Sequence, residues 1–87
     1  MVRDKIVIKN ETGLHARPAT EIAKEAMKYV SNIEFIVNGK NINAKSPLMI
    51  MAAGITEKTD MEIICDGEDE KEALENLKRV IEDQIDK

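Results

Sequence analysis

The only histidine of this 87-residue chain stands in a segment whose residue types suit the transient binding of a phosphoryl group. Residues 12–20 read Thr-Gly-Leu-His-Ala-Arg-Pro-Ala-Thr, which places His15 directly before a predicted helix. The first amide groups of a helix have no intrahelical partner and carry a partial positive charge, so an anion held there is stabilised. Arg17 adds a planar fork of donors that matches phosphate oxygens. We therefore expect Thr12, Ala16 and Arg17 to contact a phosphate carried by His15.

The same surroundings favour a nucleophilic imidazole at His15. A helix N-terminus and a nearby guanidinium both oppose the positive charge of an imidazolium, so we expect more of the ring to be neutral at neutral pH. A neutral ring nitrogen can attack a phosphoryl donor in line without a base or a metal, and Arg17 then attracts the negatively charged product. The residues alone leave one alternative open, because a lone histidine of a small domain is more often an ordinary exposed or packed side chain.

Composition argues against several other kinds of function. A net charge of −4 and a pI near 5.0, with one Tyr and one Phe as the only aromatic residues, disfavour nucleic-acid binding. The single cysteine, Cys65, excludes an internal disulfide and a cysteine zinc cluster, and its alternating surroundings predict a buried thiol. One histidine and one cysteine also leave no usual metal site or catalytic triad to assemble. No export signal and no apolar run of roughly 18 residues is present, so we expect a cytoplasmic protein without a cofactor.

The hydrophobic pattern of the first half predicts three strands and one helix. Residues 2–9 alternate as a strand with one buried face. A helix over residues 16–28 follows, with apolar residues at helical spacing. Strands 33–37 and 40–44 are joined by Asn38-Gly39, which favours the positive φ angles of a type I′ turn. The apolar stripe predicted for the helix comprises Ala19, Ile22, Ala23, Ala26, Met27 and Val30.

The second half predicts two further helices and a fourth strand. Ser46-Pro47 opens a short helix, because serine caps free amides and proline suits the first helical position, and Gly54 ends it. Residues 61–66 alternate as a strand that ends at Gly67, and a third helix with a charged outer face follows. The order β-α-β-β-α-β-α within one domain, residues 1–87, is an α+β fold with helices on one side of a mainly antiparallel sheet. Ferredoxin-like ligand-binding and RNA-binding domains share the first six elements, so this order alone assigns no function.

Residues 13–20 resemble the active-site signature of the HPr family, the histidine-containing phosphocarriers of the bacterial phosphoenolpyruvate-dependent sugar phosphotransferase system. The resemblance implies an open-faced β-sandwich with sheet order 1-4-2-3. It also implies that enzyme I phosphorylates His15, that Arg17 neutralises the phosphate, and that the IIA components of sugar transporters receive it. Similar segments elsewhere, which extend the resemblance over nearly the whole chain, are Asn38-Gly39-Lys40, Ala44-Lys45-Ser46, Ala53-Gly54-Ile55 and Gly67-Glu68-Asp69-Glu70.

By the same resemblance, Ser46 matches the serine that HPr kinase/phosphorylase modifies in many relatives, which adds that kinase and a catabolite-control regulator to the expected partners. Capping alone also explains Ser46, because serine followed by proline is a good helix start. The chain departs from the regulated pattern at Pro47 and Met49, where an aliphatic residue and a glycine are closer to the family. Relatives specialised for regulation replace the active-site histidine, so His15 favours the transport role over a mainly regulatory one.

The helix after Ser46 offers a surface for partner proteins. Residues 47–53 contain no charged side chain, and both faces of such a helix cannot point into one thin core. Flexible methionines suit a patch that meets several partners, whereas core packing explains Leu48 and Ile50 equally well. A carrier that docks through one face is expected to be a monomer. The predicted docking residues are Leu48, Met49, Met51 and Thr20, with the two methionines the stronger candidates.

Overall fold

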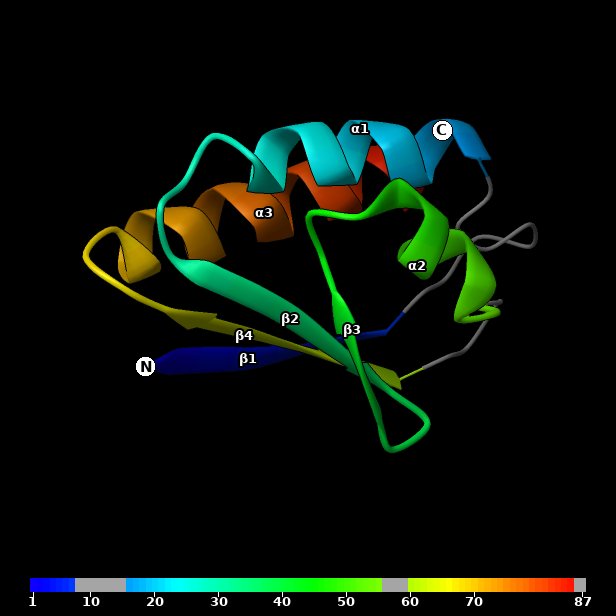
Figure 1. Ribbon diagram of the computed structural model, residues 1–87, viewed down its shortest axis with the longest axis horizontal. Coiled ribbons are helices and arrows are strands. Elements are labelled where there is room, and N and C mark those ends of the chain that lie inside the picture. The colour runs from blue at the N-terminus through cyan, green and yellow to red at the C-terminus, as the bar shows by residue number, and fades with distance from the viewer. Residues whose placement is uncertain (8–15, 56–59, 86–87) are drawn as a thin grey trace.

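The computed structural model describes residues 1–7, 16–55 and 60–85. The elements in chain order are β1 (Val2–Val7), α1 (Ala16–Ala26), β2 (Asn32–Val37), β3 (Lys40–Asn43), α2 (Pro47–Ala52), β4 (Asp60–Asp66) and α3 (Glu70–Ile85). Figure 1 shows α1 and α3 lying side by side above the sheet, with α2 near the N-terminal end of α1. The predicted order of elements is confirmed.

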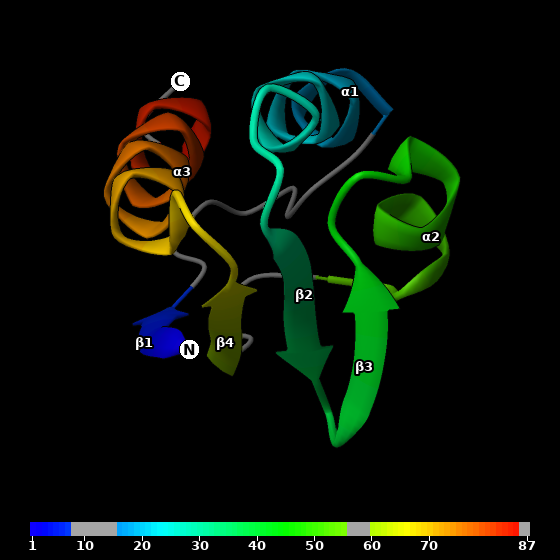
Figure 2. The ribbon, with the colours of Figure 1, turned by 60° about the vertical axis from the view of Figure 1, so that its left-hand side comes forward.

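The four strands form one sheet in the order β1-β4-β2-β3, and all three strand pairs are antiparallel. The register places Ile63 of β4 between Asp4 of β1 and Phe35 of β2. Figure 2 shows the three helices on one side of this sheet, with α3 over β1 and β4 and α2 beside β3. The open-faced sandwich with sheet order 1-4-2-3 is therefore confirmed.

Element bounds differ from the predicted ones by one or two residues. The first strand is described as far as Val7, because residues 8–9 of the predicted strand lie outside the described residues. β3 ends one residue before the prediction, although the Ala44 amide still donates a hydrogen bond to the Ile33 carbonyl at 3.0 Å. β4 begins one residue early, at Asp60.

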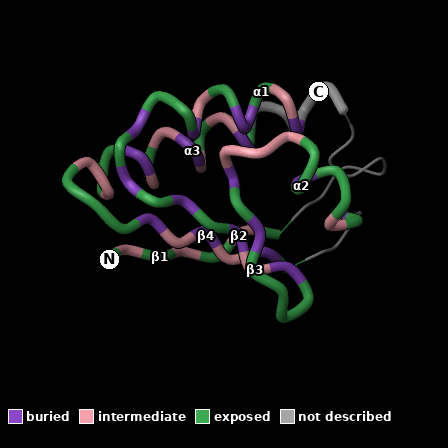
Figure 3. Tube along the Cα trace, viewed as in Figure 1, coloured by how far each residue is buried: buried purple, intermediate pink, exposed green. Residues whose placement is uncertain are grey.

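The core fills the space between the inner face of the sheet and the helices, where Figure 3 shows the buried positions. Alternate residues of β2 and β4 enter it, and three residues of α3 close it from above. Cys65 is buried as predicted, and its burial raises the pKa of the thiol to about 11. The largest fully buried side chains of β2, β4 and the helices include Ile22, Ile33, Phe35, Ile50, Met61, Ile63, Leu77 and Ile81.

The predicted apolar stripe of the first helix is wrong at its C-terminal end. Met27 and Val30 are 56% and 74% exposed, because α1 ends two residues before its predicted end and the chain then leaves the helical path. Tyr29 takes the buried position instead. Its hydroxyl donates to Glu25 and accepts from Asn76, both at 2.7 Å, which satisfies the polar group of a nearly buried ring. The residues of the stripe that are buried as predicted are Ala19, Ile22, Ala23 and Ala26.

The turn between β2 and β3 has the backbone that the sequence predicts. Asn38 and Gly39 have φ angles of 52° and 80°, the two positive values of a type I′ turn. This turn matches the right-handed twist of the strands that it joins. It therefore sets the register in which Phe35 lies opposite Ile42.

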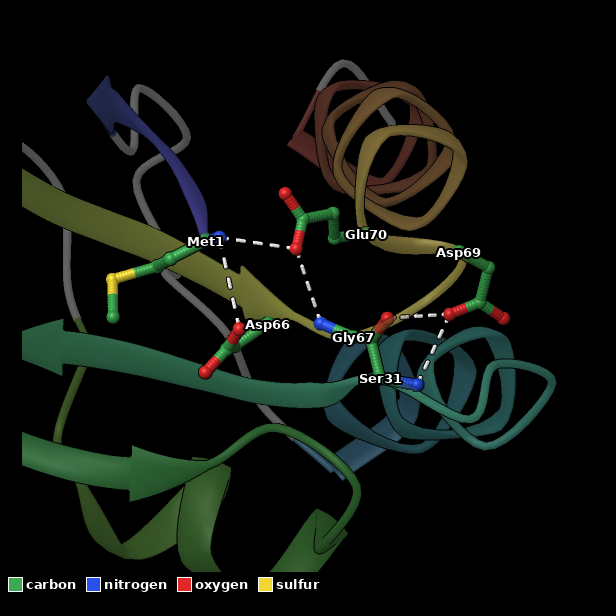
Figure 4. A network of polar contacts seen from close by, with 6 residues as sticks. All are labelled: Met1, Ser31, Asp66, Gly67, Asp69 and Glu70. Carbon is green, nitrogen blue, oxygen red and sulfur yellow. Dashed lines mark hydrogen bonds and ion pairs between the residues drawn. The ribbon is translucent and has the colours of Figure 1, made fainter.

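A buried serine and an aspartate join the α1–β2 connection to the β4–α3 turn (Figure 4). The hydroxyl and the amide of Ser31 both donate to one carboxylate oxygen of Asp69, and the Val30 amide donates to the other at 3.0 Å. Asp69 also precedes α3, where its carbonyl accepts from the Ala73 amide at 2.9 Å. The hydrogen bond from the Ser31 hydroxyl, supported by the backbone amides, lowers the pKa of the Asp69 carboxyl.

Replacing Asp69 with asparagine should lower the midpoint of thermal unfolding at neutral pH. Both side-chain oxygens of Asp69 accept hydrogen bonds, whereas asparagine has one acceptor oxygen and one NH2 group. The NH2 group would face a hydrogen-bond donor and leave it without an acceptor. Because the pKa of Asp69 is lower in the folded chain, its stabilising effect is present above the unfolded pKa of about 4 and is lost as the pH falls through the folded pKa. Melting curves followed by circular dichroism should thus differ at about pH 7 and approach each other as the pH falls below about 4. Equal midpoints at neutral pH would contradict this role for Asp69.

Candidate functional site

The backbone at the start of α1 is described, whereas Thr12 and His15 lie outside the described residues, as do the side chains of Ala16 and Arg17. α1 begins at Ala16, so His15 directly precedes the helix in the chain. The first amides of this 11-residue helix have no intrahelical partner and carry a partial positive charge. The contacts of Thr12, His15, Ala16 and Arg17 with a phosphate stay predictions.

The N-terminal end of α1 lies beside α2 in both ribbon views (Figures 1 and 2). Thr20, one turn into α1, is half-buried. The start of α1, which follows His15, and the helix that follows Ser46 are thus at the same end of the molecule.

α2 begins with the cap and the proline that the sequence predicts. Ser46 is its N-cap, with an extended backbone at φ −110° and a side-chain oxygen that accepts from the Met49 amide at 3.2 Å. Pro47 occupies the first helical position, where its missing amide hydrogen costs nothing. Ile50 is fully buried and anchors the helix, and Gly54 follows with a φ of +68°, a left-handed conformation that glycine adopts without strain.

Three apolar side chains of α2 are exposed to different degrees. Leu48, Met49 and Met51 are 71%, 41% and 37% exposed, and we call these three residues the α2 apolar surface. Leu48 and Met51 share one face, because residues three apart on a helix are neighbours. Of the two residues for which core packing was an alternative, Ile50 is in the core and Leu48 is not. Whether the α2 apolar surface docks partners stays a prediction.

The segment before α2 is held in place by contacts that the sequence did not indicate. The Lys45 amide donates to the side-chain oxygen of Asn43 at 2.9 Å, and the Ser46 amide donates to the Asn43 carbonyl at 3.1 Å. The Lys45 ammonium donates to the Tyr29 carbonyl at 2.8 Å, 16 residues away in the chain. Ser46 is therefore a half-buried N-cap in a segment that hydrogen bonds hold in place.

Removing the cap tests this description of Ser46. Ser46→Ala should lower the free energy of unfolding by about 1 kcal/mol, because the Met49 amide loses its acceptor. Ser46→Asp should stay close to the wild-type protein, since aspartate caps a helix as well as serine does. Urea unfolding measures both. Equal stability of the alanine variant and the wild type would show that the hydrogen bond contributes nothing.

The described residues also form a groove of about 430 Å³ between β1 and α3. Two of its lining residues, Asp4 and Lys78, form an ion pair at 2.6 Å, which lowers the pKa of Asp4 and raises that of Lys78. Figure 2 shows β1 and α3 at the opposite side of the molecule from α2. This groove is therefore separate from the predicted site.

Two kinds of feature are absent from the described part of the chain. No group of three histidine, cysteine, aspartate or glutamate side chains in that part could hold a metal ion. No helix among the residues that the structure describes is long and apolar enough to cross a membrane.

Comparison with known proteins gives matches along almost the whole chain. The family described as the PTS HPr component phosphorylation site matches residues 2–83. HPr-like protein Crh of Bacillus subtilis (strain 168) is 36% identical over 85 residues, which cover 98% of this chain and 100% of Crh. Phosphocarrier protein HPr of Buchnera aphidicola subsp. Acyrthosiphon pisum is 40% identical over 81 residues, which cover 93% of this chain and 95% of that protein.

Solved structures agree with these matches. The histidine-containing phosphocarrier protein of Mycoplasma superposes with a TM-score of 0.94 at 39% identity, covering 97% of this chain and 96% of that one. A crystal structure of Crh superposes with a TM-score of 0.76 at 37% identity, covering 95% of each chain, and is described as a dimer with a swapped domain.

Proposed function

This chain belongs to the HPr family of the phosphotransferase system, and from that membership we propose that His15 accepts a phosphoryl group from enzyme I and passes it to the IIA components of sugar transporters. The observation that carries the proposal is the family match over residues 2–83, which spans the segment from His15 into the first turn of α1. Because the matched relatives include phosphocarrier proteins, the chain acts in this proposal as a protein substrate of other enzymes and not as an enzyme.

The proposed transfer needs only groups that the chain carries around the start of α1. A neutral ring nitrogen of His15 attacks the phosphorus, and the new P–N bond forms as the bond to the donor breaks. The charge on the phosphate oxygens is stabilised by the first amides of α1, which have no intrahelical partner, by the Arg17 guanidinium and by the Thr12 hydroxyl. Pro18 gives up no intrahelical hydrogen bond, because it lies in the first turn. Since the group must leave again, these contacts are modest and partly exposed.

The proposed partners dock on the α2 apolar surface together with Thr20. The segment that carries this surface, residues 47–53, has no charged side chain. It lies beside the start of α1, where a partner's reacting group must arrive. Apolar area of this kind supports association, and methionine side chains adapt to partners of different shape. The carrier works in the cytoplasm as a monomer, since a single docking face serves both enzyme I and the IIA components.

A mainly regulatory role is the second candidate, and the similarity to Crh favours it. In that role HPr kinase/phosphorylase would modify Ser46, and a catabolite-control regulator would bind the product. A phosphate there would add negative charge to the docking surface and slow exchange with enzyme I. Two observations weigh against this role as the main one. The chain keeps His15, and its Ser46 is already engaged as a cap next to a proline that offers no amide hydrogen.

A small ligand-binding or RNA-binding module is the least supported candidate. Such modules stack bases on exposed aromatic rings of a sheet. Tyr29 and Phe35 are the only aromatic residues of this chain, and both are buried. Neither ring is therefore exposed for stacking on bases. The net charge of −4 also disfavours attraction to the phosphates of RNA.

Incubation with phosphoenolpyruvate and enzyme I tests the proposed function. We expect the intact mass, measured at neutral pH, to rise by about one phosphoryl group per chain. Adding a IIA domain should return the chain to its original mass as the IIA domain gains the group. A family HPr that the same enzyme I phosphorylates serves as the positive control. Failure of this chain to gain mass while that control does would overturn the proposal.

Arg17→Ala should slow phosphoryl transfer about 10- to 100-fold in kcat/KM, the loss expected for one charge-assisted hydrogen bond to the phosphate. The matched control is Lys24→Ala, which removes an exposed cation from the same helix, where it pairs only loosely with Glu21 at 3.9 Å. Rapid-quench transfer from phosphorylated enzyme I compares the two variants. Equal rates for both would count against a phosphate-binding role of Arg17.

A further inference from the structure

The sulfur-containing residues of this chain differ in how far they are exposed to solvent. The chain holds five methionines and one cysteine. Met61 and Cys65 are 1% and 0% exposed, and the raised pKa of the cysteine keeps it as an unreactive thiol. The exposed methionine residues are Met1 at 70%, Met27 at 56%, Met49 at 41% and Met51 at 37%. Oxidants dissolved in water therefore reach methionine sulfur in this protein and not its thiol.

Two of the exposed methionine residues belong to the α2 apolar surface. Met49 and Met51 flank the buried anchor Ile50 and lie in a stretch, residues 47–53, without any charged side chain. Met27 directly follows the C-terminal end of α1, whereas α2 lies near the N-terminal end of that helix (Figure 1). Chemistry at Met49 and Met51 therefore changes the surface beside the start of α1, and chemistry at Met27 does not.

We propose that Met49 and Met51 form an oxidation site through which peroxides weaken docking of enzyme I, a step that rests on the proposed function for the identity of the partner. The methionine sulfur attacks one oxygen of the peroxide and an S–O bond forms as the O–O bond breaks. After protonation the other oxygen leaves as water from hydrogen peroxide, or as an alcohol from an organic hydroperoxide. The sulfur loses two electrons and the peroxide gains them. A sulfoxide reductase reverses the change with two thiols, which become a disulfide as the sulfoxide oxygen leaves as water.

The change affects docking and spares the fold. A sulfoxide is polar, so burying it against an apolar partner costs free energy unless the partner supplies a hydrogen bond. α2 keeps its anchor at Ile50 and its cap at Ser46, and the core methionine Met61 stays out of reach. We expect the KM of enzyme I for this chain to rise about ten-fold, which corresponds to about 1.4 kcal/mol, with kcat little changed.

Mild treatment with hydrogen peroxide tests this inference. Peptide mapping by mass spectrometry should find sulfoxide at Met49 and Met51 before any at Met61. The double variant Met49→Leu with Met51→Leu keeps the apolar volume without the sulfur, so its KM should be the same before and after treatment. Met27→Leu is the matched control, an exposed methionine outside the α2 apolar surface, and it should lose affinity on treatment as the wild type does. A methionine sulfoxide reductase with dithiothreitol should restore the wild-type KM.

Two readouts separate failure of this inference from failure of the proposed function. An untreated chain that accepts no phosphoryl group contradicts the proposed function. Calorimetric titration with enzyme I, without phosphoenolpyruvate, measures docking independently of transfer. Equal dissociation constants before and after oxidation of Met49 and Met51, or no binding in either state, would overturn the inference. An equal loss in the double leucine variant would also overturn it, because the oxidised group would then lie elsewhere.

Discussion

Alanine in place of His15 is expected to abolish phosphoryl acceptance from enzyme I. His15 is the only histidine of the chain, so no other imidazole can form the P–N bond. Arg17 and the helix amides can bind a phosphate but cannot be phosphorylated in its place. We expect no incorporated phosphate under conditions in which the wild-type chain is fully phosphorylated. Phosphate incorporation measured by intact mass checks this, with far-ultraviolet circular dichroism confirming that the variant is folded.

Ser46→Ala is the matched control for the histidine variant, because it removes the other predicted phosphorylation site. It should take up phosphate from enzyme I to the full wild-type extent, since the expected loss of about 1 kcal/mol leaves a folded protein. Phosphate retained by His15→Ala would contradict the assignment. Phosphate lost from a folded Ser46→Ala variant would make Ser46 the acceptor, which also contradicts it.

Gly67→Ala is expected to lower the free energy of unfolding by about 3 kcal/mol, the upper end of the usual cost of overpacking. A Cβ at position 67 would lie 2.6 Å from both the Cα and the Oγ of Ser31, closer than such atoms approach in real structures. Ser31 cannot move away cheaply, because it is 1% exposed and donates two hydrogen bonds to Asp69 (Figure 4). Relief of the clash must therefore separate the α1–β2 connection from the β4–α3 turn.

Gly54→Ala separates the effect of close approach from the general cost of replacing a glycine. Gly54 has a φ of +68° and nothing within 4 Å of its missing Cβ. Its replacement should cost about 1 kcal/mol through left-handed backbone strain alone. Chemical denaturation of the two variants under the same conditions measures the difference. A Gly67→Ala variant no less stable than Gly54→Ala would rule out the clash with Ser31 as a determinant of stability.

Features of the fold that depend on neighbouring residues could be predicted from the sequence. Asn38-Gly39 predicted a turn of two positive φ angles, because few residues adopt such angles without strain. Ser46-Pro47 predicted the start of α2 for a similar reason, since capping and a fixed proline φ are local properties. Ile50 could not be separated from Leu48 by this reasoning, because a helix without charges has no polar face to orient it.

Several contacts between residues that are distant in the sequence could not be predicted. Ser31 and Asp69 are 38 residues apart, and neither residue type indicates a buried partner. Gly67 was predicted as the end of a strand, whereas the space it leaves for Ser31 depends on how two connections meet. Helical periodicity could not predict that α1 ends before Met27. The spacing of apolar residues does not show that Tyr29, and not Met27 or Val30, is buried.

For the candidate site, too, some features could be predicted from the sequence and others could not. The residue pattern predicted that His15 directly precedes a helix, and α1 does begin at the next residue. The assignment to a phosphocarrier family came from resemblance and is confirmed by the match over residues 2–83. The roles of individual residues depend on side-chain geometry around His15, which neither periodicity nor family membership supplies. They stay predictions that the variants above test.

The most direct test of the central claim locates the phosphate in the wild-type chain and identifies its bond. The chain is phosphorylated by enzyme I and phosphoenolpyruvate, digested at alkaline pH and mapped by mass spectrometry, with ³¹P magnetic resonance of the undigested protein alongside. We predict one phosphoryl group on the peptide that contains His15, released by acid and stable in alkali, as a P–N bond requires. A phosphoryl group that survives acid, or that maps to Ser46, would contradict the account.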